Sequence, residues 1–248
     1  MTTAGRKSGK FWDTIKTVVY AVLIALAIRT VAFEPFNIPS GSMKPTLLVG
    51  DYLFVSKYSY GYSRHSLPLS LPLIPGRILM SEPERGDIAV FKLPTDNKTD
   101  YIKRIVGLPG DRIQVREGRL HLNGEQVARR RVADFVEIDE LGRIRRTHQF
   151  DETLPNGRTY RILEHTDRGQ LDNTPVYVVP EGHYFAMGDN RDNSLDSRVL
   201  SGVGFVPAKN LVGRAEILFF SIDGSASVWE FWRWPRTIRF ERFFDSVE

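Results

Sequence analysis

The chain has 248 residues, 42% of them hydrophobic, which allows one sizeable domain or a core with an insertion. It contains no cysteine, which excludes disulfides, thiolate metal sites and cysteine nucleophiles. The formal charge is only +4, and the basic residues lie in short groups, so we expect no nucleic-acid partner.

An apolar segment near the N-terminus is the first element that the sequence predicts. The uncharged run between Lys16 and Arg29 is shorter than the roughly 20 residues that cross a bilayer, but both flanking side chains can reach the headgroups. We therefore expect a transmembrane helix over 11–33, with its N-terminus in the cytoplasm because basic residues precede it. The alternative is a cleavable signal peptide ending in Ala25-Leu26-Ala27, but the apolar run continues beyond Ala27.

Short strands separated by turn residues follow the anchor. Many of them are rich in β-branched or aromatic residues, and turn residues such as Gly, Pro or Asn recur between them, which is typical of strands. The predicted strands are 51–56, 87–92, 101–106, 112–116, 119–122, 176–179, 183–187 and 215–220, with 112–116 and 119–122 forming a hairpin. We therefore expect a mostly β fold, in which one N-terminal transmembrane helix precedes an antiparallel β-rich domain that carries a β-rich insertion.

Composition divides the chain into three expected parts. Residues 1–35 form the cytoplasmic N-terminus and the anchor, and residues 36–116 together with 183–248 form one core. The stretch 117–182 is polar and charged and interrupts that core as an insertion. We expect the arginines of the insertion to form a solvated face rather than a ligand site.

Two segments leave two interpretations open. The prolines of 67–75 forbid a regular helix and a central strand, and this apolar loop either touches lipid or packs on the domain. The C-terminal stretch 229–244 alternates aromatic residues with arginines, a composition that suits a bilayer interface. A buried edge element is the alternative, but we favour the interface because all tryptophans except Trp12 gather there.

Three short segments carry residues suited to chemistry, and they are 39–46, 100–111 and 188–198. The first is a Ser-Gly-Ser turn, and a serine hydroxyl becomes a good nucleophile only when a base takes its proton. Histidine is the usual base, but the five histidines of the chain form no recognisable triad or zinc motif. The serine/lysine variant of the triad therefore stays as the candidate.

A lysine base must be neutral, although the reference pKa of lysine is about 10.4. Burial lowers the pKa because desolvation disfavours the ammonium. In a strand, Tyr101, Lys103 and Ile105 share one face while Arg104 points to the other. Lys103 would thus lie between apolar side chains. A lone lysine in a strand is ordinarily exposed, and only the flanking sequence favours burial here.

Together the three segments, in this order behind an N-terminal anchor, resemble the type I signal peptidases, membrane-bound serine/lysine endopeptidases that remove signal peptides from exported proteins. The match covers 33–60, 84–112 and 183–222. The resemblance implies Ser42 as nucleophile and Lys103 as general base. It also implies that the Ser42 backbone N–H and the Ser40 hydroxyl form an oxyanion hole, where donors must be preset for the developing charge.

The last segment supplies supporting residues by the same resemblance. Ser194 matches the serine that hydrogen-bonds and orients the lysine amine. Asp196 and Arg198 match an acidic and basic pair, which we expect to form a salt bridge. The sequence departs from some members of the family, which have two N-terminal spans where this sequence offers one.

Specificity is implied in the same way. Six residues match positions that line the family's shallow pockets for small residues before the cleavage site, and they are Phe36, Ile38, Met43, Leu47, Tyr101 and Ile102. Such pockets would favour alanine at the first and third positions before the scissile bond, with the peptide bound as an added strand. Plain core packing is an equal alternative for each of these residues.

The resemblance implies a membrane-bound endopeptidase that cleaves exported preproteins after small-x-small sites, without a metal or another cofactor. It would span the bacterial inner membrane once, contact phospholipid, lie near the secretion translocon and hold its catalytic domain on the extracytoplasmic side. The alternatives are a serine/lysine peptidase dedicated to one partner and a non-enzymatic, membrane-anchored β-domain. A self-cleaving repressor is disfavoured by the span and by the lack of DNA-binding helices.

Overall fold

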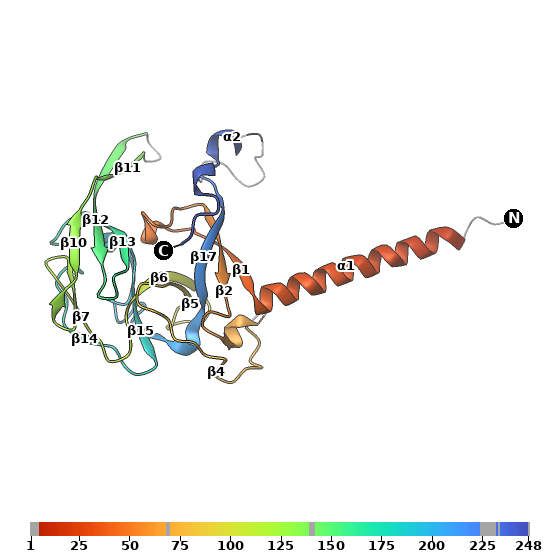
Figure 1. Cartoon of the computed structure of the whole chain (residues 1–248), viewed down its shortest axis with the longest axis horizontal. Helices are drawn as coiled ribbons and strands as arrows, with labels where there is room; N and C mark the ends of the chain where they lie inside the picture. The colour runs from red at the N-terminus through yellow and green to blue at the C-terminus, as the bar shows by residue number, and fades with distance from the viewer. Residues whose placement is uncertain (1–4, 68–69, 139–141, 224–231, 233, 248) are drawn as a thin grey trace.

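The computed structural model describes residues 5–67, 70–138, 142–223, 232 and 234–247. Its N-terminal helix α1 (Gly5–Val31) projects from the domain as a long rod (Figure 1). The part from Phe11 to Val31 is long and apolar enough to cross a membrane, and its most apolar stretch is not buried against the domain. The prediction of one N-terminal apolar helix is confirmed. The helix ends at Val31, before the predicted 33, because Phe33 already pairs with Ser56 in a sheet.

An antiparallel sheet of seven strands forms the centre of the domain (Figure 1). The long β17 lies between β2 and β5, so a late segment of the chain joins two early ones. In spatial order the strands are β1 (Phe33–Asn37), β2 (Asp51–Ser56), β17 (Leu211–Ser221), β5 (Ile88–Lys92), β6 (Asp100–Gly107), β15 (His183–Met187) and β16 (Val206–Pro207). The antiparallel, mostly β fold predicted from the sequence is confirmed.

Both faces of this sheet are covered, as the alternation along β5 shows. Ile88 and Val90 belong to one buried cluster, which also contains Leu53 of β2. Ala89 and Phe91 belong to a second cluster on the opposite face, because successive strand residues point to opposite sides. A strand buried on both faces becomes a continuous apolar run, which is why β5 could be recognised in the sequence.

Two smaller sheets pack beside the main sheet. One has the order β14-β7-β8-β9, and the other has the order β10-β12-β11 with β13 also paired to β12. Their strands are β7 (Arg112–Arg116), β8 (Arg119–Leu122), β9 (Glu125–Gln126), β10 (Ala128–Arg131), β11 (Phe135–Ile138), β12 (Ile144–Thr153), β13 (Thr159–Glu164) and β14 (Tyr177–Val178). The predicted hairpin is present as β7–β8. The predicted boundary between core and insertion falls inside one of these sheets, because β7 of the predicted core pairs with β8 and β14 of the predicted insertion. The division into core and insertion stays a prediction.

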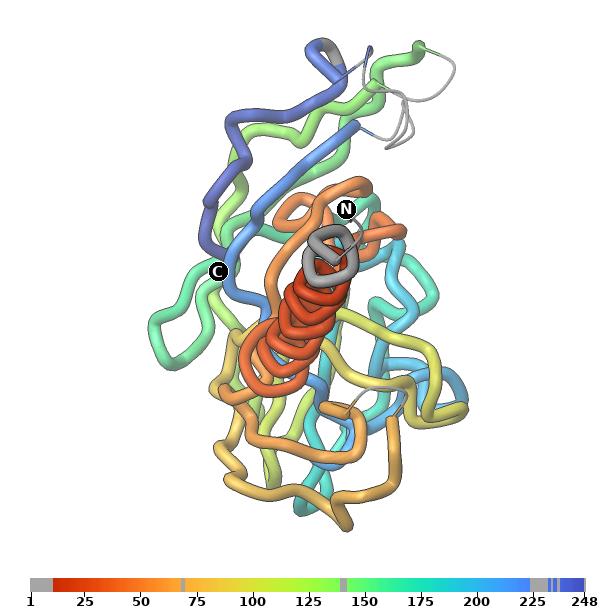
Figure 2. Tube along the Cα trace, turned by 90° about the vertical axis from the view of Figure 1, so that its right-hand side faces the viewer, coloured from red at the N-terminus to blue at the C-terminus, as the bar shows by residue number. Residues whose placement is uncertain are grey.

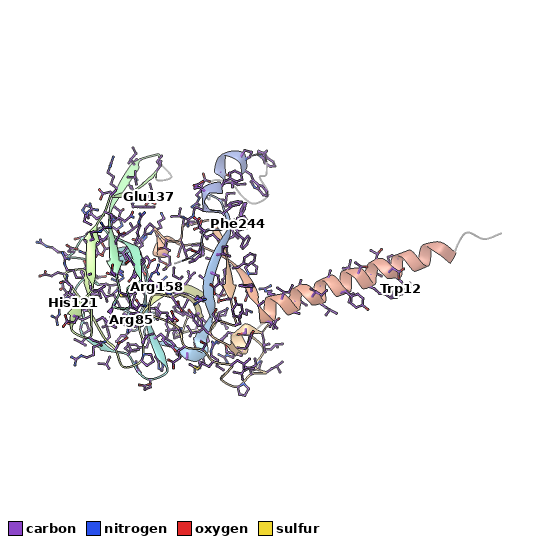
Figure 3. All side chains as sticks on the ribbon, in the orientation of Figure 1. Trp12, Arg85, His121, Glu137, Arg158 and Phe244 are labelled. Atoms are coloured by element: carbon purple, nitrogen blue, oxygen red, sulfur yellow. The ribbon has the colours of Figure 1, made fainter. Side chains whose placement is uncertain are left out.

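The β12–β13 hairpin is fixed to the main sheet by polar contacts at its turn. Arg158 Nη1 lies 2.8 Å from Asp87 Oδ1, beside the start of β5. Asn156 Nδ2 donates a hydrogen bond to the carbonyl oxygen of Arg85 at 2.8 Å. Figure 3 shows Arg85 and Arg158 lying close together between the hairpin and the main sheet. The hairpin therefore belongs to the same packed body as the main sheet.

Arg129 departs from the solvated face that we expect for the arginines of 117–182. Only 2% of its side chain is exposed, and its guanidinium lies 4.1 Å from the centre of the Phe150 ring. Its neighbour Arg130 fits the expectation, with 81% of its side chain exposed. Arg129 is covered because a guanidinium stacks well on an aromatic face, a preference that charge patterning alone does not reveal.

The C-terminal segment returns along β17 (Figure 2), where Val247 N donates to the carbonyl oxygen of Glu216. Arg242 points inward and donates to both carboxylate oxygens of the buried Asp51, at 3.1 and 2.6 Å. Phe240 and Phe244 remain largely exposed. Trp229 and Phe231 lie outside the described residues, and contact of this segment with lipid stays a prediction.

The remaining elements are short. In the proline-rich loop 67–75, Leu71 and Leu73 are exposed. Contact of this loop with lipid also stays a prediction. The elements are β3 (Tyr62–Ser63), β4 (Arg77–Ile78), α2 (Trp234–Thr237) and the 3₁₀ turns η1 (Gly41–Met43), η2 (Arg64–Ser66), η4 (Arg191–Asn193), η5 (Ala208–Asn210) and η6 (Phe240–Arg242).

Candidate functional site

The Ser-Gly-Ser turn lies in a loop between β1 and β2 that is held at both ends. Ile38 N donates to the Asp51 carbonyl oxygen at 2.8 Å, and Gly50 N donates to the Ile38 carbonyl oxygen at 3.0 Å. Met43 and Leu47 insert into the core from this loop and are fully buried. Ser42 is thereby fixed at the base of the loop, in η1, with its side chain largely buried.

Lys103 reaches Ser42 from the middle of β6. Its Nζ lies 2.6 Å from Ser42 Oγ and donates a second hydrogen bond to the Ile102 carbonyl oxygen at 2.9 Å. The lysine is only 3% exposed. Burial lowers its pKa to about 8, although the negative charges of Asp196 and Asp189 act in the opposite direction. The structure thus brings together the two residues that the sequence singled out.

Ser40 and Asn190 complete the surroundings of the nucleophile loop. Ser40 Oγ lies 3.3 Å from Ser42 Oγ. Asn190 N donates to the Ser42 carbonyl oxygen at 3.1 Å, and its Nδ2 donates to the Gly41 carbonyl oxygen at 2.9 Å. These two bonds fix the backbone on which the Ser42 side chain is mounted. Asn190 was not singled out from the sequence, although it lies inside the 188–198 segment.

Ser194 is close to the nucleophile loop but makes no hydrogen bond to Lys103. Its Oγ is buried and has no hydrogen-bond partner among the described residues. Gly188 is required for this approach, since a Cβ at Gly188 would lie 2.2 Å from Ser194 Oγ and 2.6 Å from the Ser42 carbonyl oxygen. The sequence therefore places Ser194 in the right neighbourhood, while its expected bond to the lysine is not formed.

Asp196 and Arg198 form the expected salt bridge, with Arg198 Nε and Nη2 each 2.9 Å from an Asp196 oxygen. Both residues are buried. Burial alone would raise the pKa of Asp196, but the charge and hydrogen bonds of Arg198 hold it below its ordinary value. Asp196 Oδ2 also accepts from Gly188 N at 3.1 Å. The pair thus ties the two ends of the 188–198 segment together.

A second buried ion pair, between Arg104 and Asp189, connects this segment to β6. Arg104 Nε and Nη2 donate to the two Asp189 oxygens at 2.9 and 2.8 Å, and neither side chain is more than 1% exposed. Thr46 Oγ1, in the nucleophile loop, donates to Asp189 Oδ2 at 2.5 Å. Sequence alternation indicates only that Arg104 faces away from Lys103, and nothing in the spacing identifies Asp189 as its partner.

The two ion pairs also act on the lysine. Asp196 and Asp189 are the carboxylates whose charges raise the pKa of Lys103. Each of them is engaged by an arginine, Arg198 or Arg104. Burial has the larger effect, and the pKa of Lys103 stays well below 10.5.

A groove of about 650 Å³ runs from the Ser42–Lys103 contact toward the end of α1. Four of the six predicted pocket residues line it, namely Phe36, Ile38, Tyr101 and Ile102. Met43 and Leu47 do not line it but lie in the core cluster below. The sequence did not indicate the other lining residues, which include Arg29, Glu34, Val90, Asp100, Asn193 and Leu195.

The chain is similar to known proteins along most of its length. The sequence model of the signal peptidase family, peptidase S26, matches residues 11–220. A signal peptidase I of Rickettsia typhi is 46% identical over 210 residues, covering 82% of this chain and 77% of that protein. A signal peptidase I of Rickettsia canadensis is 45% identical over 228 residues, covering 89% and 83%. A solved signal peptidase I from Enterococcus faecalis is 28% identical, with a TM-score of 0.31, and covers 54% of this chain and 97% of that one.

The Arg104–Asp189 pair predicts a large effect of Asp189→Asn on stability. The substitution removes the carboxylate that pairs with the buried Arg104 guanidinium, so we expect the free energy of unfolding to fall by about 3–5 kcal/mol. Asp151→Asn is the matched control, because Asp151 pairs with the exposed Arg130 and such pairs contribute at most about 1 kcal/mol. Denaturant unfolding of the full chain in detergent measures both. Equal effects of the two substitutions would contradict the assignment of Asp189 as a structural anchor.

Proposed function

The chain belongs to the signal peptidase family, peptidase S26, and is a protease that processes signal peptides; we propose that it does so with Ser42 as nucleophile and Lys103 as general base. The observation that carries this proposal is the 2.6 Å contact between Lys103 Nζ and Ser42 Oγ in a buried environment. A candidate base must lie within hydrogen-bond reach of the proton that it removes, and this contact meets that requirement.

The lowered pKa of Lys103 makes the proton transfer accessible. With a pKa of about 8, roughly one molecule in ten carries the neutral amine at pH 7, whereas an ordinary lysine would be neutral in only about one in several thousand. The neutral Nζ accepts the proton of Ser42 Oγ as Oγ attacks the scissile carbonyl carbon. The resulting ammonium then protonates the leaving amine, and a water deprotonated by Lys103 releases the acyl group from Ser42.

The charge on the tetrahedral oxygen requires donors that are already in place. We assign this role to the Ser42 backbone N–H and the Ser40 hydroxyl, in support of which Ser40 Oγ lies 3.3 Å from Ser42 Oγ. Ser194 has a positioning role in this scheme. Its buried Oγ, which has no hydrogen-bond partner among the described residues, is available to the Lys103 amine once the Ser42–Lys103 bond is broken during acylation. Asp196 and Arg198 support that segment.

The groove supports a preference for small residues as part of this proposal. Phe36 and Ile38 come from the β1 side and Tyr101 and Ile102 from β6, and their apolar side chains face the same space next to Ser42. We propose that an extended peptide lies between these walls, with small side chains at the first and third positions before the scissile bond. Met43 and Leu47 support the floor of the groove from the core.

The position of α1 supports a membrane anchor that holds this groove near the bilayer. The groove ends at Arg29 and Glu34, which form an ion pair where α1 meets β1. We propose that α1 crosses the bacterial inner membrane once, with the N-terminus in the cytoplasm and the β domain outside. Exported preproteins would then reach Ser42 as they leave the bilayer, next to phospholipid and to the translocon.

Cleavage of a preprotein by full-length enzyme in detergent tests the proposed pair. Ser42→Ala removes the nucleophile and Lys103→Met removes the base, so each variant should lose at least about 10³-fold in kcat/KM. The controls are Ser201→Ala and Lys209→Met, which change exposed residues of the same types. If Lys103→Met keeps near-normal activity, the base is wrong and a histidine must be considered. If only one dedicated preprotein is cut, the narrower peptidase is the better description.

The pH dependence of kcat/KM gives a second prediction. Because the lysine acts in its neutral form and its pKa is lowered from 10.5 to about 8, the rate should increase as pH rises through about 8 and then level off. Initial rates on a fluorogenic signal-peptide substrate between pH 6 and 10 would show this, with circular dichroism checking the fold at each pH. A midpoint near the ordinary histidine value of about 6.5 would point to a different base.

Substrate variants test the groove. Replacing alanine by leucine at the first position before the scissile bond should reduce kcat/KM by a factor of about 5 to 150, because an overfilled pocket costs about 1–3 kcal/mol. The same replacement at the second position should change kcat/KM by less than about threefold, since alternate side chains of an extended peptide point away from the groove. Mass spectrometry would locate each cut. Equal losses at both positions would contradict the proposed pockets.

A further inference from the structure

Three carboxylates outside the proposed catalytic site converge on one point. Glu164 ends β13, Asp172 lies in the loop that follows, and Asp192 belongs to η4. Each offers an oxygen, and these oxygens all lie within 4.8 Å of one another. The sequence predicts no metal motif here, because the three residues come from separate segments. Their convergence needs an explanation, since like charges in close contact repel one another.

Two of these carboxylates are buried and carry oxygens that lack a hydrogen-bond partner in the described part of the chain. Glu164 is 2% exposed and Asp172 is 1% exposed. Both Glu164 oxygens and Asp172 Oδ1 lack a hydrogen-bond partner among the described residues. Buried charged oxygens are normally paired or coordinate a metal, because losing their hydration is costly.

The nearby arginines do not satisfy this cluster. Arg129 Nη1 lies 3.8 Å from Glu164 Oε2, which is too far for a hydrogen bond, while its Nη2 bonds Asp167 at 3.1 Å. Arg191, which also acts on Glu164 electrostatically, is engaged by the buried Glu152 through both of its terminal nitrogens. The positive charge around the cluster is therefore largely used by other carboxylates.

The backbone around the cluster fixes two of the carboxylates. Gly169 N bonds Asp172 Oδ2, and the N–H groups of His165 and Thr166 bond Asp192 Oδ2 at 2.6 and 3.0 Å. Gly169 itself approaches both carboxylates closely, since a Cβ there would lie 2.8 Å from Asp192 Oδ1 and 3.1 Å from Asp172 Oδ2. Acceptors that the backbone fixes, next to Glu164 oxygens that lack partners among the described residues, are the features of a built site.

We propose that Glu164, Asp172 and Asp192 bind one Ca²⁺ ion. Calcium takes oxygen ligands at about 2.3–2.6 Å, so two oxygens on the same ion lie at most about 5 Å apart, and the cluster meets this limit. Calcium accepts irregular geometry with water among its ligands, whereas Mg²⁺ requires near-ideal octahedral sites. Asp192 is only half-buried, which leaves a side through which the ion and its water ligands can enter.

An ion at this point would connect the insertion to the segment that supports Ser42. Asp192 lies in η4, between Asn190 and Ser194, and Asn190 bonds the backbone of the nucleophile loop. Glu164 ends β13, and Asp172 lies between β13 and β14. The ion therefore acts as a clamp between two parts of the domain, and this inference does not depend on the proposed catalytic residues.

Calcium binding to the full chain in an uncharged detergent, after removal of metals with EDTA, tests the proposal. Isothermal titration calorimetry with CaCl₂ should give about one ion per chain, with a dissociation constant between about 10⁻⁵ and 10⁻³ M. The thermal unfolding midpoint should rise over the same concentration range. Glu164→Gln should weaken binding at least about tenfold and abolish the shift, while Glu125→Gln, an exposed acid elsewhere in the insertion, should behave as wild type.

The competing arrangement is a proton in place of the ion, with a protonated Glu164 donating to Asp172. In that case the wild type would bind no calcium, and CaCl₂ would leave its unfolding midpoint unchanged. Equal binding by wild type and Glu164→Gln would likewise overturn the proposal. Glu164→Gln removes a buried carboxyl whose oxygens lack hydrogen-bond partners among the described residues, so it should unfold in EDTA at the same temperature as wild type or higher. Asp172→Asn provides a second variant with the same expected loss of binding.

Discussion

The burial of Lys103 against Ser42 is the constraint on which the rest of the site depends. A buried ammonium loses its hydration, and this loss lowers the pKa of the lysine to about 8. The fold must therefore hold Lys103 in a buried position that is energetically unfavourable for the charged side chain. It does so by mounting the lysine in the middle of β6, between β5 and β15, where the strand cannot move without breaking the central sheet.

Lys103 differs from the nearby Arg104 and Arg198 in its ion pairing. Arg104 and Arg198 each form a bidentate ion pair with a buried carboxylate, whereas Lys103 forms no ion pair in the described part of the chain. A carboxylate in direct contact would restore the charged form of the lysine and raise its pKa. The two arginines instead engage Asp189 and Asp196, and burial outweighs the effect of these two carboxylates on the pKa of the lysine.

Much of this arrangement could be predicted from the sequence, and the exceptions have physical causes. The strands β5, β6 and β15 were recognisable because each is buried and rich in apolar residues. In contrast, β12 is mostly polar and its buried positions include Thr147 and Gln149, so its alternation carries no apolar signal.

In the candidate site, too, some residues could be predicted from the sequence and others could not. Ser42 and Lys103 stand out because nucleophile and base require particular residue types, and the resemblance to a family fixed their positions. Asp189 could not be paired with Arg104, because that contact joins residues far apart in the chain and depends on the packing of β6 against the 188–198 segment. The cluster of Glu164, Asp172 and Asp192 could not be predicted for the same reason.

The most direct test of this account is the pKa of Lys103 itself, measured by nuclear magnetic resonance on enzyme labelled with ¹³C at the lysine Cε. Lys103→Met identifies the signal by its disappearance. The account predicts that this signal titrates with a pKa of about 8, clearly below the other lysines. Titration together with the ordinary lysines, near the reference value of about 10.4, would contradict the claim that burial prepares Lys103 to act as a base.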